Sequence, residues 1–160
     1  MKTCLVGCGG IAAVHGSVLT SGIDTEFVAA ADIKPEKAQT YAENFHTKPY
    51  PSLESMLEAE KPDVLHICTP HYLHVPMTIY ALERNINVFM EKPPAISFDQ
   101  LEELKKAAAK SEAQLGFCYQ NRYNASIRAA KDLIDSGKAG KVLGARAFVT
   151  WCRGAAYYTE

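Results

Sequence analysis

Three short stretches of the sequence combine residue types and spacings that could do chemistry. The first is G-C-G-G-I-A, from Gly7 to Ala12. Gly7 permits a tight turn, Gly9 lets the backbone approach a diphosphate, and Ala12 lets a following helix pack closely. The start of that helix would add N–H donors and the positive end of a dipole. The stretch therefore predicts a dinucleotide-binding turn made by Gly7, Gly9, Gly10, Ile11 and Ala12.

An acid closes the next apolar run, EFVAAAD, at Asp32. At this distance from the glycine turn, a carboxylate is placed to accept hydrogen bonds from the adenosine ribose hydroxyls. Ile33 is included in the same predicted cofactor site. A 2′-phosphate at about 4 Å would meet a repulsion of about 4 kcal/mol at an effective dielectric of about 20. Asp32 therefore favours NAD, while Lys34 could hold such a phosphate and keeps NADP possible.

The second stretch is HICTPHYLH, residues 66–74. Its histidines and Cys68 suggest a metal site, but His66 and Cys68 fall inside a predicted strand, and no second ligand pair with zinc spacing occurs elsewhere. No metal is predicted. This strand would lie beside the first one, where a bound dinucleotide must cross the sheet. A polar loop and a helix start are the alternative interpretation of His71 and His74. Thr69 and Pro70, which end this strand, are therefore predicted to lie where the cofactor crosses.

The third stretch is NVFMEKPPA, residues 87–95, in which an apolar run ends at Glu91 and Lys92. Two prolines follow, and neither can continue a strand ladder. A lysine at this edge can hydrogen-bond a substrate hydroxyl or tune a neighbouring acid–base group. Lys92 is the predicted catalytic residue, and an exposed ion pair is the alternative. A cis Lys92–Pro93 bond is also predicted, because X–Pro bonds resist cis less than others.

Alternating strands and helices must position these three stretches. Apolar runs at 3–7, 26–32, 63–69, 86–91 and 113–119, and a short extended piece at 48–50, are separated by helical patterns. This alternation predicts an α/β fold, a doubly wound parallel sheet with strand order 3-2-1-4-5-6. Residues 1–119 would form this domain. A helix at 125–136 and a strand at 141–151 would begin a second α/β domain, 120–160, which looks incomplete because one strand cannot complete a sheet.

Composition excludes several classes of protein. The chain has 160 residues, 48% of them hydrophobic, and a net charge of −1. Nucleic-acid and membrane-surface partners usually need a basic patch, so neither is expected. No apolar run approaches the length of a membrane span. Five cysteines, an odd number without framework spacing, predict free thiols and a cytoplasmic location.

Four motifs together resemble the Gfo/Idh/MocA oxidoreductases. They are G-x-G-x-x-A with His15 after it, D-V-x-x-I-x-T-P-x-x-x-H from Asp63, E-K-P from Glu91, and G-F-x-x-x-N-R-Y from Gly116. The resemblance implies a Rossmann domain followed by an α/β domain with an open sheet. It also implies NAD(P) as cofactor, a sugar, cyclitol or related polyol as substrate, and a homo-oligomer, a dimer or tetramer.

The resemblance also implies roles for individual residues. Lys92 would lie beside the reacting hydroxyl, and Glu91 would contact the nicotinamide-side ribose. The remaining implied cofactor-edge residues are Thr69, Pro70, His74, Asn121 and Arg122. The family's general base is commonly a histidine of the second domain, beyond residue 160, so it is not assigned. His15 is expected to be structural.

The predicted function is an NAD-dependent oxidoreductase that moves hydride between nicotinamide and an alcohol carbon. The 160-residue chain is expected to bind cofactor but to lack the full catalytic site. One alternative is a non-catalytic dinucleotide-binding module or sensor, which would have no use for Lys92. Another is a reductase of a different Rossmann lineage, such as one acting on semialdehydes. It would need a catalytic cysteine, and none of the five has an obvious nucleophile context.

Overall fold

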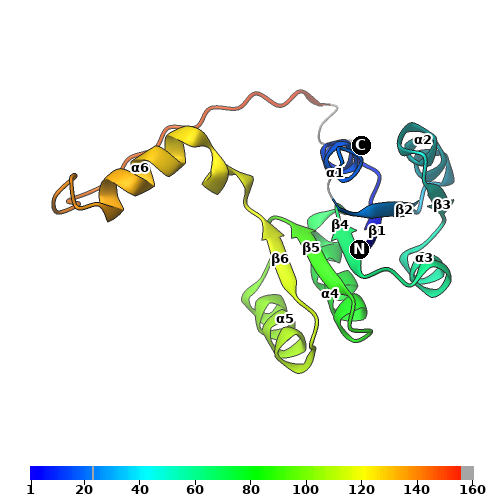
Figure 1. Ribbon diagram of the computed structural model, residues 1–160. Coiled ribbons are helices and arrows are strands. Elements are labelled where there is room, and N and C mark those ends of the chain that lie inside the picture. The colour runs from blue at the N-terminus through cyan, green and yellow to red at the C-terminus, as the bar shows by residue number, and fades with distance from the viewer. Residues whose placement is uncertain (23, 156–160) are drawn as a thin grey trace. The chain divides into compact units, whose positions relative to one another are not determined.

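The computed structural model describes residues 1–22 and 24–155 of the chain. The chain divides into two compact units, Met1–Tyr119 and Gln120–Glu160, which are described separately below. Figure 1 shows the regular alternation of strands and helices in the first unit. Residues 156–160, which belong to the second predicted domain, lie outside the described part.

Helices and strands follow one another closely along the chain. In order they are β1 (Lys2–Val6), α1 (Ala12–Leu19), β2 (Glu26–Ala31), α2 (Pro35–Phe45), β3 (Lys48–Tyr50), α3 (Leu53–Glu60), β4 (Val64–Ile67), the short 3-10 helix η1 (His71–Leu73), α4 (His74–Leu82), β5 (Asn87–Glu91), α5 (Phe98–Lys110), β6 (Leu115–Cys118), η2 (Gln120–Tyr123) and α6 (Ala125–Asp135).

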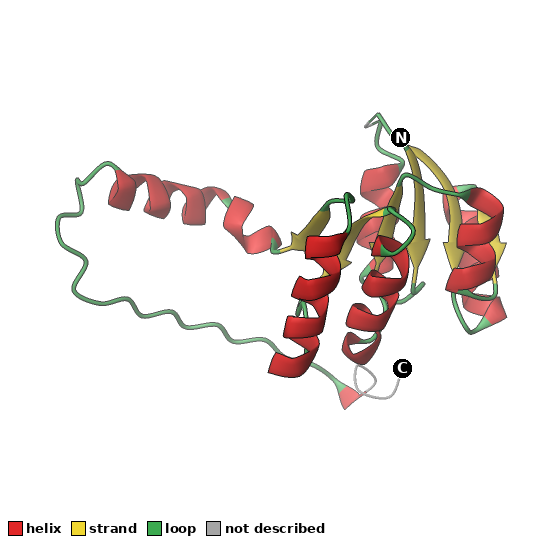
Figure 2. Cartoon of the chain, turned by 90° about the horizontal axis from the view of Figure 1, so that it is seen from below, coloured by secondary structure: helices red, strands yellow, loops and turns green. Residues whose placement is uncertain are grey.

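The strands of the first unit form one parallel sheet. Within the described residues it has six strands in the order β3-β2-β1-β4-β5-β6, and each neighbouring pair is parallel. The predicted fold class and strand order are therefore confirmed. Figure 2 shows helices on both sides of the sheet, as a doubly wound fold requires. All carboxyl ends of the strands consequently lie along one edge, which we call the carboxyl edge.

Two hydrophobic clusters cover the two faces of the sheet. Along β1, Cys4 and Val6 belong to the larger cluster, which contains buried residues of α3, α4 and α5. Leu5, between them, belongs to a smaller cluster with Ala12 of α1 and Tyr41 of α2. This alternation follows from the two-residue period of a strand. Because both faces are covered, the central strands are continuous apolar runs.

Two serines stand at the starts of helices, a position that serine favours. Ser52 Oγ accepts a hydrogen bond from Ser55 N at 3.1 Å, and Ser97 Oγ accepts one from Gln100 N at 3.2 Å. Each bond satisfies one of the N–H groups that a helix start leaves without an intrahelical partner. The Gln100 side chain accepts a bond from Ile96 N at 3.2 Å, one residue before the cap itself. These caps fix where α3 and α5 begin.

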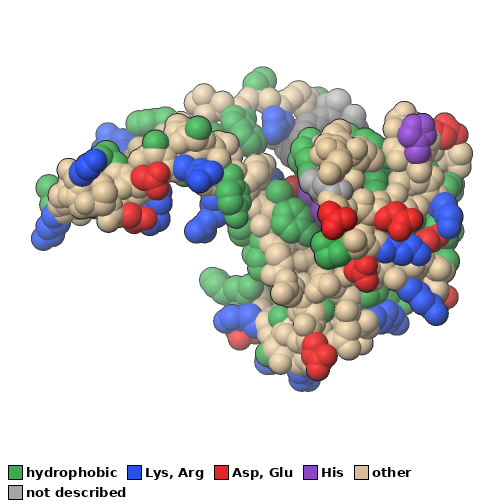
Figure 3. All heavy atoms as spheres, in the orientation of Figure 1, with side chains coloured by type: hydrophobic (Ala, Val, Ile, Leu, Met, Phe, Trp, Pro, Cys, Tyr) green, Lys and Arg blue, Asp and Glu red, His purple; other side chains and the backbone are tan. Residues whose placement is uncertain are grey.

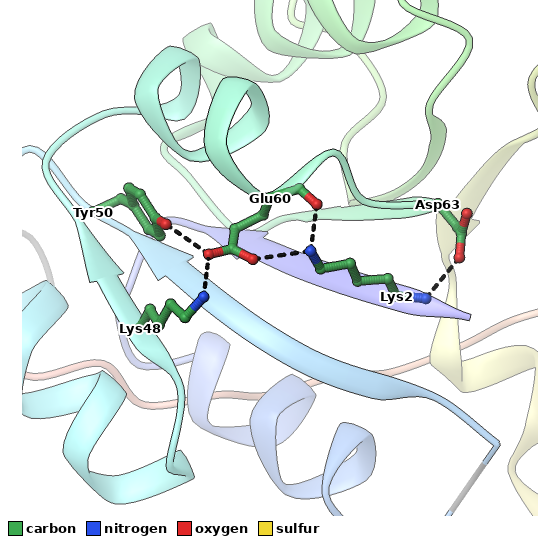
Figure 4. Close-up of polar contacts among 5 residues, drawn as sticks. All are labelled: Lys2, Lys48, Tyr50, Glu60 and Asp63. Atoms are coloured by element: carbon green, nitrogen blue, oxygen red, sulfur yellow. Dashed lines mark hydrogen bonds and ion pairs between the residues drawn. The ribbon is translucent and has the colours of Figure 1, made fainter.

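A buried acid joins β1, β3 and α3. Glu60 is 5% exposed and lies within 3.0 Å of Lys2 Nζ and 2.9 Å of Lys48 Nζ, and it accepts the Tyr50 hydroxyl hydrogen bond at 2.6 Å. Figure 4 shows its carboxylate between these three groups. At the start of the same strand, Lys2 N donates to Asp63 Oδ2 at 2.7 Å. A buried charge needs such partners, and here they come from two strands, β1 and β3.

The second unit contains η2 and α6, after which residues 136–154 form no helix or strand. Helix α6 ends at Asp135, and Gly137 follows with φ +73°, the left-handed conformation in which a glycine commonly ends a helix. The strand predicted at 141–151 is wrong, because these residues form no ladder. An apolar, β-rich run becomes a strand only beside a partner strand, and the described residues of this unit supply none.

Three features of the whole chain bear on its class. None of the helices in the described residues is long and apolar enough to cross a membrane. The cysteines at 4, 8, 68, 118 and 152 all lie in the described residues, and none of them is in a disulfide there. Figure 3 shows one face of the molecule, on which acidic and basic side chains of the first unit are interspersed rather than gathered by sign.

Candidate functional site

The turn after β1 passes against the end of β4. Gly7 has φ +91°, and its N–H donates to Ala31 O at 2.8 Å. A Cβ atom built on Gly7 would lie 2.7 Å from the Cys68 carbonyl carbon and from Thr69 N. Both the positive φ and the close approach exclude other residues at this position. The turn is therefore held where β1, β2 and β4 end together.

The start of α1 leaves both space and donors open. Cβ atoms built on Gly9 and Gly10 would meet no atom within 4 Å. The N–H groups of Gly9, Gly10 and Ile11 have no hydrogen-bond partner among the residues that the structure describes. Ile11 stands at the N-cap and cannot satisfy them with its side chain. Free N–H donors, open space and a helix N-terminus fit a diphosphate group, as the sequence predicts.

Ala12, at the start of α1, packs against α2 on the side away from the open turn. Its side chain has no exposed surface, and its carbonyl accepts a hydrogen bond from the Tyr41 hydroxyl at 2.8 Å. Gly16, one turn further along α1, allows the same approach of α2, because a Cβ there would lie 2.6 Å from the Tyr41 hydroxyl. Ala12 therefore contributes by packing α1 closely, rather than by an exposed side chain.

Asp32 fixes the glycine turn to the end of β2. Its Oδ2 accepts from Cys8 N at 2.8 Å, and its Oδ1 accepts from Lys34 N at 2.9 Å. Each carboxylate oxygen can accept a further bond, and Asp32 is only half-buried. Ile33, next to it, is 81% exposed. The pair therefore offers a hydroxyl-binding carboxylate beside an exposed apolar surface, as a ribose and an adenine require.

His74 joins the ends of β4 and β5. Its ring is completely buried, with Nδ1 2.8 Å from Pro93 O and Nε2 2.9 Å from Thr69 O. Without exposed surface, His74 cannot contact a bound dinucleotide through its own atoms. Its contacts instead hold the Thr69–Pro70 segment and the prolines after β5 at a fixed separation. Thr69 is half-buried and Pro70 is exposed at the carboxyl edge.

The end of β5 presents an inward acid and an outward amine. Glu91 is 4% exposed, and its Oε1 lies 3.1 Å from His15 Nε2, while its Oε2 accepts from Lys92 N at 3.2 Å. Lys92 is exposed, and its Nζ has no hydrogen bond or ion pair within the described residues. The predicted cis Lys92–Pro93 bond is confirmed. At the end of β5, the Lys92 amine is therefore available to a ligand, whereas the Glu91 carboxylate is bonded within the protein.

Electrostatics supports an ionised Glu91. Burial raises the pKa of this carboxyl, but hydrogen bonds from His15 and Cys118 and the nearby Lys92 charge outweigh it, and the pKa lies below its usual value. Burial, and then the neighbouring His15, lower the pKa of His66 to about 4. At neutral pH, Glu91 is therefore a carboxylate and His66 a neutral ring.

A group of polar residues that the sequence did not connect lies beneath this strand end. His15 Nδ1 is 2.9 Å from His66 Nδ1, and Phe89 lies against both rings, at centroid distances of 5.9 and 5.2 Å. The ligand-type atoms of His15, Glu91 and Cys118 all lie within 4.8 Å of one another. These atoms already satisfy one another by hydrogen bonds, so their proximity does not require an ion. The only sequence signal was a histidine within an otherwise apolar strand.

The predicted site residues of the first unit converge on one edge. The glycine turn, Asp32 with Ile33, Thr69 with Pro70, and Glu91 with Lys92 follow the ends of β1, β2, β4 and β5, which are neighbours in the sheet. Asn121 lies in the second unit, within η2, where its Oδ1 is 3.5 Å from Asn124 Nδ2. It is therefore described only within that unit.

Comparison with known proteins identifies the family of this arrangement. Residues 1–119 match the family model GFO_IDH_MocA, described as an oxidoreductase family with an NAD-binding Rossmann fold. The chain is 30% identical over 144 residues to the D-glucoside 3-dehydrogenase of Escherichia coli (strain K12). The aligned region covers 89% of this chain and 41% of that protein.

Solved structures agree. The WlbA dehydrogenase from Bordetella pertussis, in complex with NADH and UDP-GlcNAcA, is similar at 31% identity and a TM-score of 0.83, over 87% of this chain and 43% of that one. The myo-inositol 2-dehydrogenase from Lactobacillus plantarum is 28% identical, with a TM-score of 0.83 over 89% of this chain and 43% of that one. The chain thus spans about two fifths of the length of its relatives. It belongs to the Gfo/Idh/MocA family of oxidoreductases with an NAD-binding Rossmann fold.

Proposed function

We propose that this protein is an NAD-dependent dehydrogenase that moves hydride between nicotinamide and an alcohol carbon of a sugar, cyclitol or related polyol. One observation carries the proposal: the open glycine turn, Asp32 and the unpaired amine of Lys92 lie along one carboxyl edge. The family membership supports the cofactor. The similarity to a glucoside dehydrogenase and an inositol dehydrogenase supports the substrate class.

Each residue would have a separate task. The N–H groups of Gly9, Gly10 and Ile11 would bind the diphosphate at the positive end of α1. Asp32 would accept hydrogen bonds from the adenosine ribose while keeping its two backbone donors. When bound, the nicotinamide would supply the hydride acceptor or donor. The Lys92 ammonium would donate a hydrogen bond to the substrate oxygen and stabilise negative charge that develops there.

The cofactor should be NAD rather than NADP. A 2′-phosphate at about 4 Å from the Asp32 carboxylate would be repelled by about 4 kcal/mol at an effective dielectric of about 20. Lys34 would not offset this fully, because its ammonium is exposed and water screens it. We also propose a cytoplasmic location, which the lack of disulfides among the described cysteines supports, and association of the whole protein with copies of itself.

Calorimetric titration of the folded chain with NAD tests the cofactor site. Gly9→Ala should leave the fold unchanged, since the added Cβ has open space in the chain alone, but should weaken NAD binding at least about tenfold by occupying the diphosphate position. Gly144→Ala, an equally open glycine in the second unit, is the matched control. If no heat is released with NAD, or Gly9→Ala binds like the unmodified chain, the cofactor assignment is wrong.

Turnover assays test the catalytic assignment. Because the 160-residue chain is expected to lack the full catalytic site, NADH formation is followed by fluorescence in the whole protein, with a panel of sugars and inositols. Lys92→Ala should lower kcat about a hundredfold or more, while NAD affinity stays within about twofold. Lys106→Ala, which removes an exposed amine on α5, is the control and should leave both quantities unchanged. Equal losses in the two variants, or a loss of NAD affinity alone in Lys92→Ala, would remove Lys92 from the catalytic role.

A further inference from the structure

Three polar side chains form a continuous hydrogen-bonded path under the end of β5. His66 of β4 contacts His15 of α1 through the two Nδ1 atoms at 2.9 Å, and His15 Nε2 contacts Glu91 Oε1 at 3.1 Å. The second Glu91 oxygen, Oε2, accepts the N–H of Lys92 at 3.2 Å. The His15 and Glu91 side chains are 6% and 5% exposed. The path therefore runs from a central strand, through α1, to the backbone of Lys92.

The chemistry of the groups sets the direction of the middle bond. An ionised carboxylate only accepts hydrogen bonds, so His15 Nε2 must carry a proton to bond with Glu91. His66 either donates to His15 Nδ1 or accepts from it, and both arrangements leave the proton on His15 Nε2. The Glu91 pKa, which lies below its usual value, is consistent with an ionised acceptor.

Packing around the path keeps the rings in place. Phe89, the middle residue of β5, lies against the His15 ring at 5.9 Å and the His66 ring at 5.2 Å between centroids. The two histidine rings are perpendicular, at an interplanar angle of 88°. With both nitrogens bonded and one face covered, the His15 ring has one orientation. That orientation in turn fixes the Glu91 carboxylate.

We propose that His15 is a positioning residue that orients Glu91 and, through the Glu91 carboxylate, the backbone from which Lys92 extends, with His66 fixing the His15 ring. The role in catalysis rests on the proposed function of Lys92. His15 lies in the first turn of α1, directly after the proposed diphosphate turn. One helix thus connects the proposed diphosphate turn to the Glu91–Lys92 end of the proposed cofactor site, and a shift of α1 would be transmitted to Lys92.

The structure also suggests the competing explanation. His15, Glu91 and Cys118 offer one ligand atom each within 4.8 Å of one another, which a metal ion could use. Binding of zinc would require His15 Nε2 to lose its proton and the hydrogen bond to Glu91 to be broken. The protonation of His15 Nε2 therefore separates the two explanations directly.

NMR of the chain labelled with 15N in histidine is the first test. At neutral pH, the two-bond proton–nitrogen spectrum should show His15 protonated at Nε2, with slow exchange. His46 and His71 are exposed and serve as internal references for rings that exchange freely with water. An unprotonated Nε2 on His15, exchange as fast as the references, or displacement of the Nε2 proton by stoichiometric zinc would overturn the proposal.

Two variants of one residue are the second test. His15→Gln keeps an N–H donor near the Nε2 position, whereas His15→Leu removes it. Hydrogen exchange of the Lys92 amide should accelerate roughly tenfold in His15→Leu and change less than about twofold in His15→Gln. His71→Leu is the control. Equal acceleration in both His15 variants would show a packing role only and overturn the proposal. If His15→Leu does not fold, the histidine NMR spectrum of the unmodified chain still shows whether His15 Nε2 is protonated and so tests the proposal.

These measurements do not depend on the cofactor. NAD titration that fails while His15 Nε2 is protonated would refute the proposed function and leave the hydrogen-bonded path intact. NAD binding with an unprotonated Nε2 would refute the positioning role alone. The two proposals therefore fail separately.

Discussion

Gly7 lies so close to Cys68 that a Cβ atom on Gly7 would be 2.7 Å from the Cys68 carbonyl carbon. This separation is shorter than any relaxed contact between carbon atoms, and the opposing atoms are backbone atoms of the central strand region. The contact joins the tip of β1 to the tip of β4, the two strands between which the dinucleotide is expected to cross.

Gly7→Ala should therefore destabilise the chain. The added methyl group meets backbone rather than a flexible side chain, and φ +91° is unfavourable for alanine. We expect a loss of at least about 2 kcal/mol in the free energy of unfolding, measured by urea titration. Gly9→Ala, which meets no atom within 4 Å, should unfold like the unmodified chain. Equal stability of all three proteins would contradict the observed approach.

Asp32→Ser should change the preference between the two nicotinamide dinucleotides. Serine removes the negative charge, so the ratio of NADP to NAD affinity should rise at least about tenfold, which calorimetry with both cofactors measures. The affinity for NAD should fall in the same variant, because the ribose acceptor is lost. Asp99→Ser, in the first turn of α5, is the charge-matched control and should leave the ratio unchanged.

Glu60→Gln should lower the free energy of unfolding without changing the structure of the carboxyl edge. The amide cannot accept from Lys2, Lys48 and Tyr50 as the carboxylate does, so we expect a loss of about 1–3 kcal/mol in urea unfolding. Glu58→Gln, on the exposed face of the same helix, is the matched control and should have no measurable effect. A Glu60→Gln chain as stable as this control would show that the cluster contributes little.

The same carboxyl makes stability depend on acid pH. Hydrogen bonds from Lys48 and then Tyr50 lower the pKa of Glu60 from 4.5 to about 2. Because the folded pKa is the lower one, the charged form stabilises the fold above about pH 4.5, and this contribution is lost as the pH falls toward about 2. Unfolding midpoints of the unmodified chain and Glu60→Gln should differ at pH 6 and converge near pH 2. A difference that is constant over this range would refute the assignment.

His74→Leu should destabilise the loops after β4 and β5. Leucine fills a similar space but leaves the Thr69 and Pro93 carbonyls without their imidazole contact, at a cost of about 1–3 kcal/mol. His71→Leu, an exposed histidine three residues earlier, is the control. Urea unfolding measures both. If the two variants are equally stable, the His74 ring does not hold these loops.

Most of the first unit could be predicted from the sequence because its signals are local. Five of the six parallel strands are short, mainly apolar runs between turn residues, whereas β3 is the short polar stretch Lys48–Tyr50. The capping serines at 52 and 97 mark helix starts one residue before they occur. Strand order follows from the alternation of strands and helices together with the glycine turn. Once the order is known, the ends of the strands must share an edge, which brings Gly7, Asp32 and Lys92 together.

The remaining features depend on contacts between residues that lie far apart in the sequence, and local sequence patterns do not reveal such contacts. The strand expected at 141–151 lacks a neighbouring strand in the described residues, so its composition alone did not produce a ladder. Glu91 and His15 are 76 residues apart, and nothing in either motif indicates that they bond. His74 was expected to line the cofactor, yet it is completely buried between two carbonyls. Local patterns identify an element, whereas packing decides what its polar side chains contact.

The double use of Asp32 has a consequence for anyone who wishes to re-engineer this protein for biotechnology. Its carboxylate repels an extra phosphate, but it also ties Cys8 and Lys34 to the end of β2 through their N–H groups. A substitution that only removes the charge also removes both of these hydrogen bonds, so weaker repulsion of the phosphate would be combined with a less ordered loop. A change of cofactor preference from NAD to NADP therefore has to introduce an uncharged hydrogen-bond acceptor at position 32 together with a new cation nearby.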